Sequence, residues 1–171
     1  PNQEINGLTM GGVGDGTTLD HIQVSYSGDD SYEWFGGTVN AKYLIAYKAV
    51  DDDFDTDYGY AGHVQFAVSL RDPDIADVSG SNGFESDNYN PGINAGNPSL
   101  DEPYTSAVFS NVSVFGPRAT ASTAYDALHQ HGAHLRRNTK LQIYNTIFAG
   151  NKWGIRIEGP SALNAIADEL K

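Results

Sequence analysis

The sequence predicts an all-β fold, a parallel β-helix solenoid of about five to six coils. The first observation is a repeat: residues 29–37 (DDSYEWFGG) match residues 51–59 (DDDFDTDYG) at a constant offset of 22, and residues 81–88 (SNGFESDN) are a third variant. The second observation is that each repeat contains two short strand patterns, separated by turn residues among which the 19 glycines are prominent. Units of this length bury their apolar faces only by stacking on their neighbours.

The first strand of each unit alternates apolar and polar residues, as a half-buried strand does. In residues 19–26, the side chains of Ile22, Val24 and Tyr26 share one face. The equivalent strands of later units are expected at residues 42–48, 64–70, 107–115 and 141–148. A β-sandwich would also contain many short strands, but it would not keep one offset across both strands of a unit.

The second strand of each unit is shorter, and its alternation separates an inner face from an outer face. These strands are expected at residues 32–35, 54–57, 84–87, 133–136 and 155–158. In the register that the repeat defines, their large apolar residues all point inward except Phe35. The residues that remain on the outer face are Glu33, Phe35, Asp55, Asp57, Glu85, Asp87, His134, Arg136, Arg156 and Glu158.

Two insertions and a terminal helix complete the expected organisation. Residues 71–106 contain four prolines, and residues 117–131 contain an alanine-rich piece in which we expect one or two helical turns. Residues 1–160 would form the β-helix, and residues 161–171 a short helix with Ser161 as its N-cap. Because the chain begins at Pro1, we expect it to be part of a longer protein.

Composition excludes several classes of function. The chain has 22 acidic and 10 basic residues and a net charge of −12, so it has too few cations to neutralise nucleic-acid phosphates. It has no cysteine, which excludes disulfides and thiolate metal sites. No apolar run reaches the ~18 residues that span a bilayer. Cations and neutral sugars stay compatible with this charge, and the oligomeric state is left open.

The outer face of the second strands is the predicted functional site, because the repeat stacks carboxylates there. Rungs of a parallel sheet lie ~4.8 Å apart, and carboxylates at that distance repel unless a cation or an arginine lies between them. Ca²⁺ accepts several carboxylate oxygens in flexible geometry. The predicted ligands are Asp55, Asp57, Glu85 and Asp87, with Asp53 as a further candidate. The alternative is a solvated acidic face whose turn aspartates cap backbone amides.

The segments GTTLDHIQVSYSGDDSYEWFGGTVNAKYLIAYKAVDDDFDTDYGY and VSGSNGFESDN resemble the right-handed parallel β-helix proteins of the pectate-lyase-like superfamily. More narrowly, they resemble secreted or cell-surface β-helix proteins of Bacteroidota, which implies the same location here. In pectate lyases, Ca²⁺ on one sheet bridges a uronate carboxylate, and an arginine or lysine removes the C5 proton before β-elimination. By position, the resemblance implies Asp55, Asp57, Glu85 and Asp87 as Ca²⁺ ligands and Arg136 or Arg137 as the base.

Other chemistries involve the same face. His129, His131 and His134 could ligate Zn²⁺, and His134 could instead act as an acid–base group. Asp55 or Asp57 opposite Glu85 or Asp87 could supply the two carboxylates of a glycoside hydrolase. The candidate sugar contacts are Glu33, Phe35, Tyr58 and Arg156, with Tyr60 and Tyr89 as further aromatic residues beside the acidic face.

Two functions of different classes follow. The first is a non-catalytic β-helix module of a secreted or cell-surface protein, stabilised by Ca²⁺ and used for adhesion, glycan contact or as a stalk. The second is a polysaccharide lyase or hydrolase acting on an acidic glycan. An enzyme needs arginine or lysine side chains converging beside the acidic cluster, whereas a module pairs these groups with each other. We favour the module, because the sequence contains no catalytic motif beyond the repeat itself.

Overall fold

The computed structural model describes residues 4–88 and 102–159, in which all regular secondary structure is β. Within these ranges no helix is long and apolar enough to cross a membrane. The strands are β1 (Leu8–Gly11), β2 (Leu19–Ser25), β3 (Tyr32–Phe35), β4 (Ala41–Tyr47), β5 (Phe54–Asp57), β6 (His63–Leu70), β7 (Phe84–Ser86), β8 (Val108–Phe115), β9 (His131–Leu135), β10 (Gln142–Ala149) and β11 (Trp153–Ile157).

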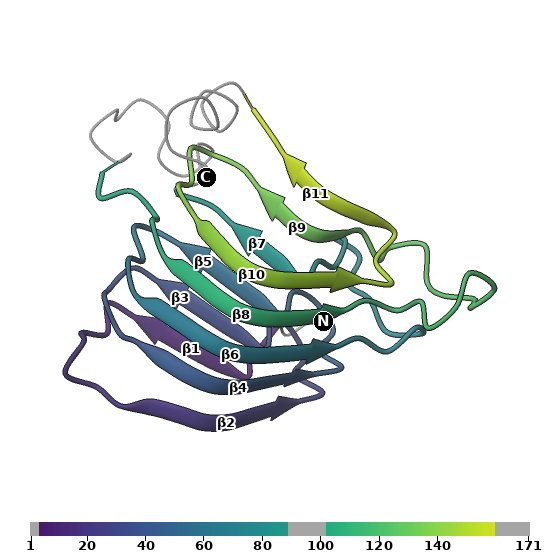
Figure 1. Cartoon of the computed structure of the whole chain (residues 1–171), viewed down its shortest axis with the longest axis horizontal. Coiled ribbons are helices and arrows are strands. Elements are labelled where there is room, and N and C mark those ends of the chain that lie inside the picture. The colour runs from purple at the N-terminus through teal and green to yellow at the C-terminus, as the bar shows by residue number, and fades with distance from the viewer. Residues whose placement is uncertain (1–3, 89–101, 160–171) are drawn as a thin grey trace.

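The strands form two parallel sheets that face each other across the core (Figure 1). One sheet has six strands in the order β1-β3-β5-β7-β9-β11, and the other has five in the order β10-β8-β6-β4-β2. Consecutive strands alternate between the sheets, so each coil contributes one strand to each sheet and stacks on the coil before it. This is the predicted all-β, parallel β-helix architecture.

The pairing register is the one that the repeat predicts. Tyr32 lies opposite Phe54, and Phe54 lies opposite Phe84. The outward residues Glu33, Asp55 and Glu85 are stacked in the same way. The strand β1 was not predicted, although Leu8 and Met10 alternate with polar or small residues and Met10 is buried. It adds one more rung before β3.

Inward aromatic side chains form a continuous stack through the core. The ring centroids of Tyr32 and Phe54 lie 5.8 Å apart, and those of Phe54 and Phe84 lie 5.2 Å apart. All three side chains are fully buried. The hydroxyl of Tyr32 donates hydrogen bonds to the carbonyl oxygens of Ile22 and Ile45, so its polar end is satisfied by the opposite sheet.

The five-stranded sheet bends at one residue in each strand, and this residue has a positive φ. The residues are His21, Tyr43, Phe66, Asn111 and Asn145, with φ between 47° and 58°. Asparagine enters this left-handed region more readily than a bulky side chain, for which it costs roughly 1–2 kcal/mol. The rings of His21, Tyr43 and Phe66 stack on each other, with centroid distances of 4.6 and 5.3 Å.

The connections differ in part from the expected ones. The helical turns expected within residues 117–131 are absent. The backbone N–H of Thr120 donates to the hydroxyl of Thr123, and the N–H of Thr123 donates to the carbonyl oxygen of Thr120, so these residues close a turn instead. The expected insertion at 71–106 contains β7, and the one at 117–131 ends where β9 begins. The expected helix at 161–171 lies outside the described residues.

Removal of one ring from the aromatic stack should destabilise the fold strongly. We expect Phe54→Ala to lower the free energy of unfolding by about 3–5 kcal/mol, since the vacated space is enclosed by Tyr32, Phe84 and Phe109. Phe35→Ala removes the same ring from the outer face of the neighbouring strand and should cost less than about 1 kcal/mol. Urea unfolding of both variants measures the difference, and equal losses would contradict the inward register.

Candidate functional site

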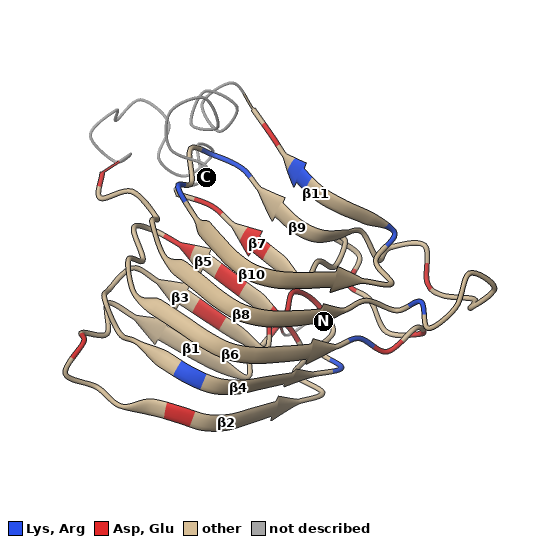
Figure 2. Cartoon of the chain, in the orientation of Figure 1, with Lys and Arg blue, Asp and Glu red and all other residues tan. Residues whose placement is uncertain are grey.

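The outer face of the six-stranded sheet carries a ladder of charged side chains, one from each rung after β1. Figure 2 shows acidic segments on β3, β5 and β7 and a basic segment on β11. The strand register stacks these residues with Thr9 as the first member. The column is Thr9, Glu33, Asp55, Glu85, His134 and Arg156. Carboxylates therefore occupy three consecutive rungs, and basic groups follow on the next two.

In the C-terminal half of this ladder, acidic and basic groups pair with each other. Arg136 bonds to Glu85, and its Nε donates to Asp87 at 2.8 Å. Arg137 donates to the same Asp87 carboxylate at 2.6 Å. Asp87 itself is buried, whereas the two arginine side chains are partly exposed.

The last two rungs are paired through Glu158. His134 contacts its carboxylate at 2.9 Å through Nε2, and Arg156 contacts it at 2.7 Å. Burial would lower the pKa of Arg136, but the carboxylates of Glu85 and Asp87 outweigh burial and raise it. Arg136 is therefore held as a cation, which is unfavourable for a catalytic base.

In the N-terminal half of the ladder, no basic side chain in the described part of the chain forms an ion pair with Glu33, Asp55 or Asp57. Burial raises the pKa of Glu33 to about 7 and that of Asp57 to about 6. Burial, Asp30 and Glu85 raise the pKa of Asp55 well above its usual range. The Oδ1 atom of Asp55 is buried and has no hydrogen-bond partner. The ladder thus changes from a compensated half to an uncompensated half between β7 and β5.

A second ladder, made of asparagine and aspartate side chains, runs through the turns that precede the strands of this sheet. The side-chain oxygen of each member accepts the backbone N–H of the equivalent residue on the next rung. Asp30 N donates to Asn6 at 3.2 Å, and Asp52 N donates to Asp30 at 2.8 Å. Asn82 N donates to Asp52, and His131 N donates to Asn82 at 3.1 Å.

The two central members of this turn ladder are aspartates, whereas the two end members are asparagines that make the same contact. Asp30 and Asp52 are 6% and 4% exposed, so each buries a carboxyl group for a hydrogen bond that a neutral amide supplies equally well. Burial and the nearby carboxylates of Asp51, Asp29 and Glu33 raise the pKa of Asp30 to about 9. Burial and Glu85 raise the pKa of Asp52 well above its usual range. The buried carboxyl groups of Asp30 and Asp52 therefore require either a proton or a nearby cation.

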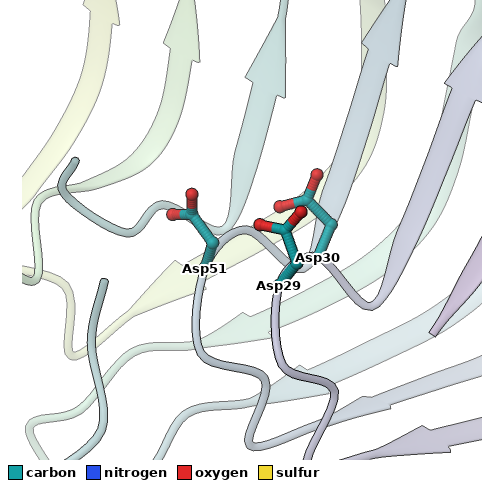
Figure 3. Close-up of side chains that lie close together, drawn as sticks. All are labelled: Asp29, Asp30 and Asp51. Carbon is teal, nitrogen blue, oxygen red and sulfur yellow. The ribbon is translucent and has the colours of Figure 1, made fainter. Parts of the chain in front are cut away.

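Two groups of carboxylates have the spacing of a cation site, and Asp30 belongs to both. In one group Asp30, Glu33 and Asp55 place their ligand oxygens within 4.8 Å of one another, and in the other Asp29, Asp30 and Asp51 do so. Figure 3 shows that the second group comes from two adjacent turns. Oxygens on opposite sides of a Ca²⁺ ion lie about 4.8 Å apart at its usual bond length of ~2.4 Å, so both groups fit this ion.

This geometry places one of the predicted ligands in a carboxylate group and leaves the others outside it. Asp55 belongs to the first group, and Glu33, which was predicted as a sugar contact, belongs there too. Glu85 and Asp87 lie on the predicted face but are engaged by Arg136. Asp57 lies on the next column of the same sheet, and its carboxylate accepts the backbone N–H of Tyr58.

Asp53 points away from the ladder. Its carboxylate is fully buried and faces Arg71 across 3.5 Å, and Arg71 also donates to the carbonyl oxygens of Ala49 and Asn82. Asp29, Asp30 and Asp51 were not predicted as ligands, because a turn gives no periodicity from which side-chain directions can be read. The sequence does contain a positional indication for Asp30. Asp30 and Asp52 each stand two residues before the first inward ring of the following strand.

The three histidines proposed for Zn²⁺ have separate partners. His129 contacts the carbonyl oxygen of Asp72, His131 contacts the side-chain oxygen of Asn82, and His134 contacts Glu158. Burial lowers the pKa of His131 to about 4. None of them belongs to a group of three metal-binding side chains within the described ranges 4–88 and 102–159.

The aromatic residues beside the ladder are of two kinds. Phe35 and Tyr58 pack against each other on the outer side, with ring centroids 6.1 Å apart, and Tyr58 is exposed. Tyr60, expected beside the acidic face, is instead fully buried, and its hydroxyl donates to Val39. Its position after the tight turn at Gly59 returns the side chain to the core. Tyr89 lies outside the described residues.

Comparison with known proteins agrees with this architecture. A family model described as a pectate-lyase-like β-helix domain matches residues 1–171. The chain belongs to this family. Neither the curated proteins nor the solved structures contain a match. The narrower resemblance to proteins of Bacteroidota stays a prediction.

The raised pKa values predict how the cation-free protein responds to pH. Unfolded carboxyl groups titrate near pH 4, whereas Glu33 and Asp51 titrate at about 7 and Asp30 at about 9 in the fold. Their stabilising contribution is complete below the unfolded pKa and is lost as the pH rises through the folded values. His131, with a folded pKa of about 4, is neutral in both states above about pH 6.5.

In EDTA, the thermal midpoint should therefore decrease as the pH is raised from about 6.5 to about 9. We expect a decrease of at least about 3 °C, which corresponds to about 1 kcal/mol for a chain of this size. Asp30→Asn keeps the hydrogen bond to Asp52 and removes the group of highest stated pKa, so it should reduce the decrease. A midpoint that rises across this range in the wild type would contradict the pKa shifts.

Proposed function

We propose that this chain is a non-catalytic β-helix module of a secreted or cell-surface protein, in which bound Ca²⁺ links adjacent coils. The observation that carries the proposal is the group formed by Asp30, Glu33 and Asp55, whose ligand oxygens lie within 4.8 Å of one another. Within residues 4–88 and 102–159, no arginine or lysine forms an ion pair with them. Asp30 and Glu33 belong to one coil and Asp55 to the next. A cation held between them opposes the separation of the two coils.

The turn ladder supports a cation over a solvated acidic face. A solvated face keeps its carboxylates in water, whereas Asp30 and Asp52 are buried and Asp55 has a buried oxygen without a partner. Asp29 and Asp51 add two further carboxylates next to Asp30. Ca²⁺ takes six to eight oxygen ligands in flexible geometry, which suits such a cluster better than the strict octahedron of Mg²⁺.

The pairing of the basic residues supports a module over an enzyme. Arg136, Arg137, His134 and Arg156 each contact Glu85, Asp87 or Glu158, so the arginines beside the acidic residues are neutralised within the ladder. The exposed ring of Tyr58, packed on the half-buried Phe35 beside this face, offers an apolar surface for glycan contact or adhesion. A stalk would use the same stacked coils without a ligand on this surface.

A Ca²⁺-dependent polysaccharide lyase is the second candidate, and one observation favours it. Arg136 and Arg137 directly follow β9 and contact Glu85 and Asp87 of the acidic face, in a chain of the pectate-lyase-like family. For proton abstraction, Arg136 would have to leave Glu85 and Asp87 and lose its proton. A glycoside hydrolase is a weaker candidate, since Glu85 and Asp87 are both engaged by arginine.

Calcium should stabilise the protein, and this effect should depend on Asp30. A ligand at about 100 times its Kd adds about 2.7 kcal/mol, which moves the thermal midpoint of a chain of this size by about 5–10 °C. We expect this rise from EDTA to millimolar Ca²⁺ and a smaller rise with Mg²⁺. Asp30→Asn and Asp55→Asn should abolish most of the Ca²⁺ response while raising the midpoint in EDTA at neutral pH.

Asp74→Asn is the matched control, because it makes the same chemical change at an exposed turn residue that belongs to neither carboxylate group, and it should keep the full Ca²⁺ response. An unchanged midpoint in wild type would reject the calcium site. Incubation with acidic polysaccharides and Ca²⁺ tests the lyase separately. We expect no unsaturated products, and turnover that disappears in Arg136→Ala would establish the enzyme instead.

A further inference from the structure

The outer face of the five-stranded sheet is almost uncharged in a strongly acidic chain. Its five strands contain one acidic residue, Asp20, and one basic residue, Lys42. The whole chain has 22 acidic and 10 basic residues. Figure 2 shows this sheet in tan apart from one red segment on β2 and one blue segment on β4. This face is therefore the part of the sheet surface where electrostatic repulsion between copies of the chain is weakest.

The same face exposes large apolar side chains. The exposed members are Tyr43, Ile45, Phe66, Leu70, Phe115, Tyr144 and Ile147, with exposed fractions between 39% and 59%. They come from β4, β6, β8 and β10, which are neighbours in the sheet. Two hollows of about 570 and 430 Å³ lie on this surface, the first beside Lys42 and Gln65 and the second beside Tyr43 and Phe66. Exposed apolar residues gathered on one face, here interspersed with uncharged polar residues such as Ser110 and Ser113, are characteristic of an interaction site.

Backbone strain is concentrated in the same surface. Tyr43 and Phe66 hold φ values of 57° and 58°, at the bend where β8 and β10 carry Asn111 and Asn145. Asparagine would adopt this conformation with less strain, and the two asparagine side chains bond to each other. The aromatic residues are exposed, so they add little to the core in return. Strain retained at an exposed position is a pointer to function.

We infer that this face packs against the same face of a second copy of the chain. A symmetric interface must be self-complementary. An apolar surface meets this condition, and its two charges are of opposite sign. The acidic ladder on the other sheet does not, because Glu33 and Asp55 would meet an equally acidic partner. The partner that fits is an uncharged, apolar protein surface, and the second copy supplies one.

The size of the face agrees with a weak, reversible dimer. Five strands of seven or eight residues, at ~4.8 Å between strands and ~3.3 Å per residue, cover roughly 550 Å². The smaller specific interfaces bury about 600 Å² on each partner. The remaining charge repels, because each copy carries −12. Salt screens this repulsion, so the dimer should strengthen as ionic strength rises, opposite to an association held by ion pairs.

Sedimentation equilibrium of the whole chain at low and high salt tests this inference. We expect a monomer–dimer equilibrium in wild type, with more dimer at high salt. The double variant Tyr43→Asn/Phe66→Asn removes two exposed rings and places asparagine where the backbone favours it. It should weaken dimerisation by at least about tenfold without lowering the thermal midpoint. Ile45→Lys should act in the same direction, because it sets like charges against each other.

Tyr58→Asn is the matched control: it replaces an exposed tyrosine at positive φ (49°) beside the other sheet and should leave dimerisation unchanged. A wild type that stays monomeric at the highest soluble concentration would overturn the inference. Association that survives both face variants would also overturn it, by assigning the contact to the ends of the stack or to another surface. The result is independent of the cation site, because the measurement is made in EDTA and in Ca²⁺.

Discussion

The constraint on which this structure depends is the vertical stacking of equivalent residues from one coil to the next. The register places Tyr32, Phe54 and Phe84 above one another, and it does the same for Glu33, Asp55 and Glu85. Rings and amides gain from a like neighbour at ~4.8 Å, because they stack or bond along the axis. Carboxylates lose, because like charges at that distance repel. One geometric rule thus stabilises the core and creates an electrostatic problem on the outer face.

The chain resolves this problem in two ways along a single column. From β9 onward, basic residues enter the ladder, and they neutralise Glu85, Asp87 and Glu158. Before β7 no such residue enters, and the turn aspartates add further negative charge at Asp29, Asp30 and Asp51. An evenly solvated face would not separate into a paired half and an unpaired half. The Ca²⁺ ion that we propose for the unpaired half would take the place of the missing arginines.

Stacking also explains how much could be read from the sequence. A constant offset of 22 fixes the register of both strands, so the inward rings and the outward carboxylates follow directly from alternation. Turns carry no such alternation, so the direction of Asp30 and of the inward Asp53 could not be predicted. The same holds for Tyr60, which returns to the core after Gly59. Strand β1 was missed because its sequence, LTMG, lacks the acidic and aromatic residues by which the repeat identifies β3, β5 and β7.

The two sheets differ in what their outer faces require of a partner. The six-stranded sheet carries acidic groups that arginine neutralises, and it carries unpaired carboxylates that require protons or, as we propose, a metal ion. The five-stranded sheet carries exposed rings and aliphatic side chains, and Tyr43 and Phe66 keep a strained backbone there. In the isolated coil stack, the interaction that offsets this strain is the mutual stacking of the rings. A partner surface that buries these rings would add a further stabilising interaction. The uncharged face is therefore where this module is best suited to contact another apolar surface.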